Sequence, residues 1–247
     1  MSVIGTIKIA VLFTMFLLAV SFPVRWFMAD ASRAEAQAYV DLWYQDGSRL
    51  NLAAWQRANS LSERAVFWHS SAATWALMAE VTYWGAFLPE NEQPTSYIPQ
   101  VYLEQALLSY RKSLSLQPVS AYAWMASANI MARLGRRDSE YRQAIELAKA
   151  YGPNEVPVFL LMMDTVLPYW TDQSAAVKVL VSAWVKDEVE RYQWAYGLDR
   201  KRLKSAMRVL ADYGVAELGC PYLPQDVPVK VKLKYCTSIV ASVAVTG

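Results

Sequence analysis

Two tryptophan-led segments in the middle of the chain share one pattern of large and small residues. Segment 72–79 reads AATWALMA and segment 121–128 reads AYAWMASA, so Trp75 matches Trp124 and Ala79 matches Ala128. The tryptophans are 49 residues apart, but segment 87–101 between them is a turn-rich stretch of 15 residues with three prolines. Removing this insertion leaves a period of 34 residues. A fixed period of this length predicts stacked helical hairpins.

The residues before the second segment read as the end of the preceding hairpin. Segment 106–118 (ALLSYRKSLSLQP) reads as the second helix of a unit that Pro118 ends, and the next first helix opens at Trp124. Phe159 follows Pro153 by the same six residues that separate Trp124 from Pro118. Over about residues 50–195 the chain resembles the tetratricopeptide-repeat (TPR) family.

The resemblance implies a packing role for each matched residue. A large ring packs on the neighbouring helix, and a small residue four positions later lets the paired helix approach. The chain departs from the family pattern where alanine replaces glycine at that crossing, and where Thr82 and Met131 replace the usual tyrosine. We therefore expect a TPR-like array without a regular superhelix. The residues expected to carry the repeat packing are Trp75, Ala79, Trp124, Ala128 and Phe159.

The N-terminus carries an uncharged apolar run over residues 9–24 (IAVLFTMFLLAVSFPV). A spanning helix needs about 20 apolar residues, and Lys8 can extend its amine to the interface. Trp26 and Phe27 follow as interfacial anchors. A cleaved signal peptide is the alternative, since Ala29 and Ala31 form a small-x-small pattern. Both readings place the rest of the chain outside the cytoplasm, so we expect a single-pass protein of a bacterial inner membrane with a periplasmic C-terminal domain.

The tail from residue 215 changes its hydrophobic period. Segment 229–235 (VKVKLKY) alternates strictly, as half-buried strands do, and segment 238–245 (SIVASVAV) is a short β-prone run. These segments predict a small C-terminal β-hairpin. Cys220 and Cys236 lie in the same tail with fifteen residues between them. In an oxidising compartment they are candidates for one disulfide, with two unpaired thiols as the alternative.

The composition excludes most zinc, haem and iron–sulfur sites, and the sequence shows no convergent set of catalytic residues. The chain has one histidine and two cysteines, too few for common zinc, haem or iron–sulfur sites. His69 lacks a nucleophile elbow, and Asp164 is a single acid inside an apolar run. The net charge of +2 gives no bulk field for nucleic acid. We expect no enzymatic activity, no cofactor, no metal and no nucleic-acid partner.

Two groups of residues are candidates for contact with a partner. Tyr97 and Tyr102 flank the insertion, where exposed aromatic rings would suit sugar rings. Basic side chains gather in two patches, which suit an acidic polysaccharide, lipid headgroups or an acidic protein surface. The basic candidates are Arg133, Arg136, Arg137, Arg200, Lys201, Lys204 and Arg208.

The fold expected from these features is all-α. A transmembrane anchor or signal peptide (1–28) precedes a juxtamembrane helix (29–48), a TPR-like helical domain (49–214) and a tail with short β-strands (215–247). TPR-like arrays present a groove to other proteins, so the resemblance implies a membrane-anchored scaffold or adaptor, expected in exopolysaccharide biosynthesis or export. The alternatives are a glycan-binding module of the cell envelope and a subunit of a secretion or pilus machine. The sequence leaves the partner, the polymer and the oligomeric state open.

Overall fold

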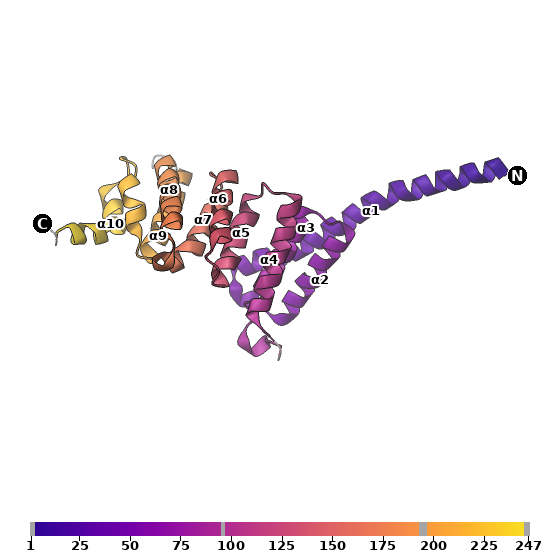
Figure 1. Ribbon diagram of the computed structural model, residues 1–247, viewed down its shortest axis with the longest axis horizontal. Helices are drawn as coiled ribbons and strands as arrows, with labels where there is room; N and C mark the ends of the chain where they lie inside the picture. Colours follow the sequence, from indigo (N-terminus) through magenta and orange to yellow (C-terminus); the bar gives the residue numbers. More distant parts are fainter. Residues whose placement is uncertain (1–2, 95–96, 193–196, 245–247) are drawn as a thin grey trace. The chain divides into compact units, whose positions relative to one another are not determined.

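The computed structural model describes residues 3–94, 97–192 and 197–244, and the regular structure within these ranges is entirely helical (Figure 1). The prediction of an all-α chain is therefore confirmed. The chain divides into two compact units, residues 1–118 (unit 1) and 119–247 (unit 2). Unit 1 contains α1 (Val3–Gln45), α2 (Leu52–Trp68), α3 (Ala72–Gly85) and α4 (Pro99–Leu116). Unit 2 contains α5 (Ala121–Arg133), α6 (Ser139–Tyr151), α7 (Val156–Val166), α8 (Ala175–Arg191), α9 (Gly197–Asp212) and α10 (Val229–Ala244).

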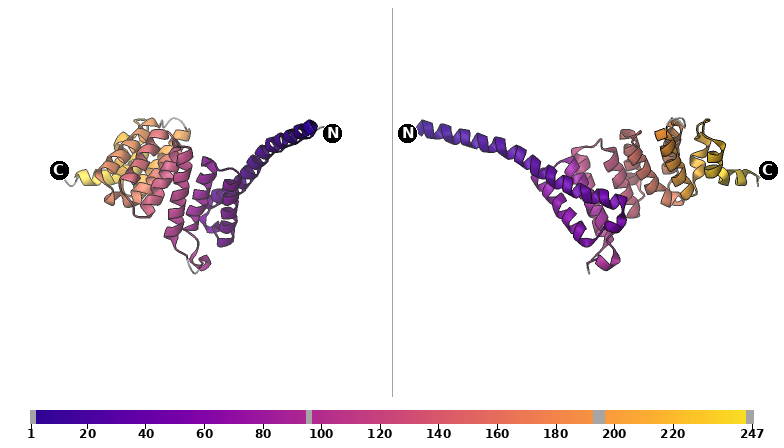
Figure 2. Two further views of the ribbon diagram at one scale, coloured as in Figure 1. Left: turned by 45° about the vertical axis from the view of Figure 1, so that its right-hand side comes forward. Right: turned by 180° about the vertical axis from the view of Figure 1, so that it is seen from behind.

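The first helix of unit 1 has two parts with different surroundings. Among the described residues, α1 is the one helix long and apolar enough to cross a membrane, judged by length and composition. Its second half packs on α2 and α3 instead, and the buried positions follow a helical stripe with spacings of three and four. The figures show the first half projecting from the packed helices of unit 1 (Figure 2). The residues of the stripe are Ala29, Ser32, Ala36, Val40 and Trp43.

The core of unit 1 forms where this stripe meets α2 and α3. Trp43 is only 1% exposed and lies within 6.0 Å of the Trp84 ring, centroid to centroid. Asn51 caps α2 through its side chain, and Ser71 caps α3 in a capping box with Thr74. The caps begin each helix at a defined residue, so the apolar faces meet in register. The core cluster comprises Ala36, Val40, Trp43, Leu50, Ala58, Leu61, Leu77, Val81 and Leu88.

In unit 2, α5 packs against both α6 and α7. Gly135 ends the turn after α5 with a φ of 75°, and the Arg136 amide then donates to the Met131 carbonyl at 2.8 Å. Asp138 caps α6 by accepting from the Glu140 and Tyr141 amides at 3.0 and 3.2 Å. The chain reverses between these two caps, and α6 packs on α5 with the Tyr141 and Ile145 side chains completely buried.

The matched aromatic residues occupy equivalent places in three helices. Trp75, Trp124 and Phe159 are each the fourth residue of their helix, in α3, α5 and α7. Four positions beyond the tryptophans, Ala79 and Ala128 are fully buried. Phe159 packs edge-on against Trp184 of α8, with ring centroids 6.2 Å apart. The stacking of these segments as TPR repeats stays a prediction.

The predicted C-terminal β-hairpin is wrong, because residues 229–244 form helix α10. Pro228 precedes the helix, and its carbonyl accepts from the Val231 amide at 2.8 Å. On the helix, Tyr235 is buried and Val231 half-buried, four positions apart, whereas Leu233 is exposed. The alternation of valine and lysine therefore does not mark a strand with one buried face, because these residues lie on a helix. An isolated two-stranded hairpin is only marginally stable in water, whereas the helical tail packs on α9.

Gly152 gives a direct test of the packing at the start of α5. A Cβ added at Gly152 would lie 2.5 Å from the Ala121 Cβ. We expect Gly152→Ala to lower the free energy of unfolding by about 1–3 kcal/mol, because this overlap forces the backbone to shift. Chemical denaturation measures the effect. Gly47→Ala is the control, since its Cβ would meet nothing within 4 Å, and equal losses in both variants would contradict the packing.

Candidate partner-binding cleft

A cleft of about 310 Å³ opens between α5, α7 and the 3₁₀ turn Leu167–Asp172 that follows α7. Amide, guanidinium, carboxylate and hydroxyl groups all contribute to its walls. A mixture of donors and acceptors is what peptide groups and charged side chains need from a binding site. The lining residues are Asn129, Ala132, Arg133, Asp164, Thr165, Pro168, Tyr169 and Tyr213.

A chain of hydrogen bonds fixes the floor of this cleft. The Arg133 Nε donates to the Asn129 Oδ1 at 3.1 Å, and the Asn129 Nδ2 donates to the Thr165 Oγ1 at 3.0 Å. The Thr165 hydroxyl in turn donates to the Leu161 carbonyl at 2.6 Å. Asn129 and Thr165 are only 6% and 1% exposed. The chain therefore links α5 to α7 through buried polar atoms and sets the direction of the Arg133 guanidinium.

Asp164 supplies the acid of the cleft. Asp164 keeps an exposed surface, but partial burial of its carboxyl raises the pKa above the ordinary value of 3.8, and the nearby Arg133 opposes the rise. Among the described residues that line the cleft, it is the one carboxylate. A cationic group on a partner would favour the ionised form of the Asp164 carboxyl, which partial burial disfavours.

The raised pKa of Asp164 predicts a pH-dependent stability difference. A folded-state pKa above the unfolded value of 3.8 favours folding at low pH, and this contribution is lost as the pH rises through the folded pKa. We expect Asp164→Asn to be more stable than the wild type at pH 7, with a difference that vanishes below pH 3.8. Thermal melts over this pH range measure it. A constant difference at all pH values would contradict the assignment.

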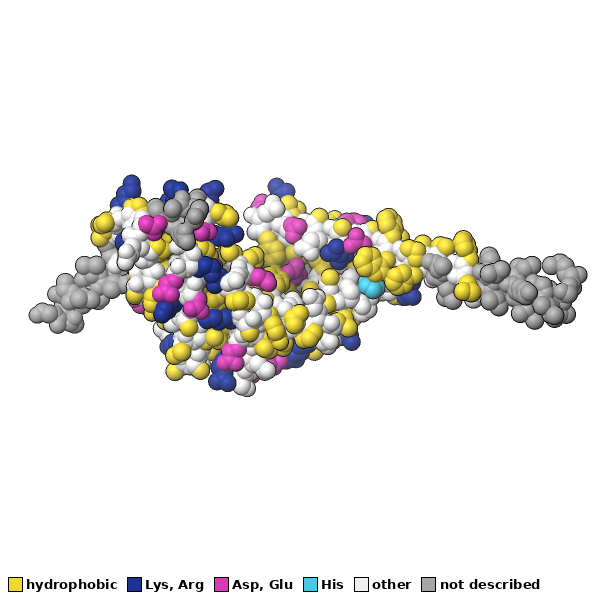
Figure 3. All heavy atoms as spheres, turned by 90° about the horizontal axis from the view of Figure 1, so that it is seen from above, with side chains coloured by type: hydrophobic (Ala, Val, Ile, Leu, Met, Phe, Trp, Pro, Cys, Tyr) yellow, Lys and Arg dark blue, Asp and Glu magenta, His cyan; other side chains and the backbone are white. Residues whose placement is uncertain are grey.

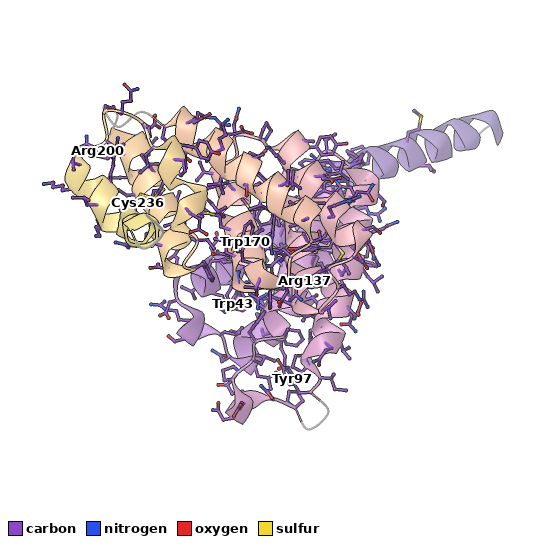
Figure 4. All side chains as sticks on the ribbon, turned by 60° about the vertical axis from the view of Figure 1, so that its left-hand side comes forward. Trp43, Tyr97, Arg137, Trp170, Arg200 and Cys236 are labelled. Carbon is purple, nitrogen blue, oxygen red and sulfur yellow. A yellow bond between two sulfur atoms is a disulfide. The ribbon has the colours of Figure 1, made fainter. Side chains whose placement is uncertain are left out.

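Arg137 does not line the cleft but contacts Tyr169, which does. Its guanidinium carbon lies 3.9 Å above the Tyr169 ring centroid, a cation–π contact. The Arg137 Nε is buried. Arg137 is labelled in Figure 4. Arg137 thus holds the Leu167–Asp172 turn in place, and it presents less charge to solvent than the sequence suggests.

A second, basic groove of about 450 Å³ lies between α9 and α10. All the charged side chains that line it are cationic, and Arg200 lies nearby at the start of α9 (Figure 4). A neighbouring cleft of about 260 Å³ shares Lys201 and Ser205 and adds the apolar side chains of α7. The residues of the basic groove are Lys201, Lys204, Ser205, Arg208, Val231, Lys234 and Tyr235.

A disulfide between Cys220 and Cys236 ties α10 beside this groove, with the two Cα atoms 5.9 Å apart. It closes a loop with a sequence separation of 16 residues. We expect Cys220→Ser to lower the stability of α10 by about 3 kcal/mol, because the unfolded tail regains its freedom. Hydrogen exchange of the α10 amides measures the loss, and reduction of the wild type is the control. Unchanged exchange in both would contradict this role.

The structure gives the two candidate tyrosines of unit 1 a packing role. The Tyr97 hydroxyl donates to the Gly85 carbonyl at 3.0 Å, and its ring lies 5.4 Å from the Tyr102 ring. Tyr102 packs edge-on against Trp55 at 5.4 Å. Both are half-buried, and burial raises the pKa of Tyr97. Figure 4 shows Tyr97 in the segment between α3 and α4. They brace the insertion and form no open row of rings.

Of the seven basic candidates, the structure brings Arg133 into the polar cleft and Lys201, Lys204 and Arg208 into the basic groove. Arg136 is exposed outside both. Sequence reasoning missed Asn129, Thr165, Tyr169 and Tyr213. Asn129 alone gave a signal, as an amide within an alanine- and methionine-rich helix.

Within the described ranges, no cluster of three or more histidine, cysteine, aspartate or glutamate side chains is placed to hold a metal ion. No protein-family model matches the chain, and no curated protein is significantly similar to it.

Proposed function

We propose that the protein is a non-enzymatic, membrane-anchored scaffold that presents the cleft of unit 2 to a partner protein. The observation that carries the proposal is the hydrogen-bonded chain from Arg133 through Asn129 to Thr165, with Asp164 beside it. These groups stand on helices and are oriented before any ligand arrives, which lowers the entropic cost of binding. Among the described residues that line the cleft there is one carboxylate, whereas glycoside hydrolysis uses a pair.

The setting of this scaffold is the bacterial envelope, with α1 as an inner-membrane anchor and the helical units in the periplasm. The apolar first half of α1 and the Cys220–Cys236 disulfide support this placement, since disulfides persist in oxidising compartments. The assembly proposed as its partner is an exopolysaccharide synthesis or export system. A secretion or pilus machine is the alternative assembly.

The test is purification of the tagged full-length protein from native membranes in mild detergent. Wild type is compared with Arg133→Glu and Asp164→Lys, which reverse the two charges of the cleft, and with Arg142→Glu as a control on the exposed side of α6. We expect polysaccharide-assembly or secretion subunits to co-purify with the wild type and the control, and to be depleted at least about tenfold in the cleft variants. Equal recovery with all four proteins would refute the proposal.

The basic groove supports a second function, binding of an acidic polysaccharide. Lys201, Lys204, Arg208 and Lys234 line one cavity, and α10 is fixed there by the disulfide. The test compares alginate with neutral dextran by calorimetry, at low and high salt. We expect salt-sensitive binding of alginate that Lys204→Glu weakens and Lys112→Glu, the same charge change in unit 1, does not. Equal binding of alginate and dextran would contradict this function.

A further inference from the structure

A cluster of aromatic side chains lies where the projecting half of α1 enters the packed part of unit 1. Trp26 and Phe27 of α1 are 54% and 71% exposed, and Phe67 near the end of α2 is 74% exposed. Phe67 packs edge-on against Trp68 with ring centroids 5.4 Å apart. We name Trp26, Phe27, Phe67 and Trp68 the aromatic corner. Figure 3 shows hydrophobic side chains gathered around the histidine, which is His69, at the base of the projecting helix.

Because α1 and α2 run antiparallel, Trp26 and Phe27 of α1 and Phe67 and Trp68 of α2 lie at the same height along α1. Arg57 of α2 forms an ion pair with Glu35 of α1 at 2.9 Å. Twelve residues later, the His69 ring lies 5.7 Å from the Trp26 ring of α1. As α2 proceeds, it therefore approaches earlier residues of α1. The end of α2 and the α2–α3 turn lie beside Trp26, where a cavity of about 270 Å³ is lined by both segments.

This level coincides with the end of the apolar run. The run ends at Val24, two residues before Trp26, which is about 3 Å along a helix. Tryptophan prefers the interface between headgroups and acyl chains, and an exposed phenylalanine gains free energy when it enters that region. The exposed Arg25 precedes Trp26 on α1, and the exposed Arg64 lies four residues before Trp68 on α2; such cationic side chains suit lipid phosphates.

We propose that the aromatic corner inserts into the headgroup region of the membrane that α1 crosses, as a second contact besides the helix. The inference rests on the proposed anchor. Two contacts, one through α1 and one through the α2–α3 turn, restrict the tilt and rotation of unit 1 on the bilayer. A helix alone would leave unit 1 free to swing.

The test attaches an environment-sensitive fluorophore to single cysteines in the oxidised full-length protein, in nanodiscs of phosphatidylcholine and phosphatidylglycerol. The two native cysteines are bonded, so labelling is specific. Phe67→Cys reports the corner, and Ser70→Cys is a second position on the same turn. Met15→Cys reports α1, and Asn91→Cys is an exposed control in the α3–α4 segment.

We expect labels at positions 67 and 70 to emit at shorter wavelength than the label at 91. We also expect lipids with a quencher near the headgroup to reduce the emission of both corner labels. The emission of the label at position 91 should stay unchanged. Quenching at 15 by deep quenchers, without quenching at 67 or 70, would overturn the inference and leave the anchor intact. No quenching at 15, 67 or 70 would overturn both. Equal quenching at 67 and 91 would also overturn the inference.

Discussion

Replacing Arg191 with alanine is expected to lower the free energy of unfolding of unit 2 by about 3 kcal/mol, because it leaves a buried carboxylate without its cation. The Glu188 side chain is only 2% exposed, and the Arg191 Nη1 lies 2.8 Å from its Oε2. The Tyr192 hydroxyl donates to the other carboxylate oxygen, and burial raises the pKa of Tyr192. Arg191 also donates to the Pro153 carbonyl at 3.3 Å, so it joins α8 to the segment before α7.

A double-mutant cycle separates the buried charge from lost packing. Glu188→Gln in the Arg191→Ala background removes the unpaired charge and is expected to recover most of the loss. Arg142→Ala is the matched control, because the Arg142–Glu146 pair is exposed, with side-chain exposures of 47% and 50%, and should contribute less than about 1 kcal/mol. Hydrogen exchange of the α8 amides localises the effect. If Arg191→Ala and Arg142→Ala lower the free energy of unfolding equally, the buried Arg191–Glu188 pair stabilises unit 2 no more than an exposed pair does.

The second large effect is expected at Trp43, the largest fully buried side chain of the unit 1 core. Trp43→Ala should destabilise unit 1 by about 3–5 kcal/mol, through lost burial and the cavity left behind. The indole Nε1 is buried without a hydrogen-bond partner, so Trp43→Phe removes an unsatisfied donor and should cost less. Hydrogen exchange of the α2 and α3 amides in detergent-solubilised protein measures both.

Trp26→Ala is the control for the same helix. Trp26 is 54% exposed, so its loss should leave amide exchange in detergent nearly unchanged. Equal destabilisation by Trp26→Ala and Trp43→Ala would mean that the second half of α1 is not the packed half.

The all-α class is predicted from the sequence because helix signals are local. The hydroxyl caps and the glycine after α5 each act within one or two turns, whereas the match of Trp75 with Trp124 is read across 49 residues. Two outcomes depend on distant residues. The tail alternates like a strand, but it forms helix α10, which contacts α9 and is bonded to Cys220. Asn129 and Thr165 are 36 residues apart in sequence, and neither residue type alone indicates that they meet.

Tyr97 and Tyr102 show the same limit for candidate sites. Their place beside a proline-rich insertion suggests exposed rings, yet the insertion folds back so that they contact Gly85 and Trp55. Asp164 is the opposite case. A lone acid in an apolar run is visible in the sequence, and the structure places it in the wall of the polar cleft.

The central claim, that the cleft of unit 2 binds a partner protein, is tested most directly by photo-crosslinking in native membranes. A photoreactive phenylalanine replaces Tyr213, which lines the cleft and is 41% exposed, or Tyr151 of α6, which is 43% exposed and does not line the cleft. We expect a discrete crosslinked protein from position 213 that is absent from position 151 and is lost with Asp164→Lys. The same products from both positions, or none from position 213, would contradict the claim.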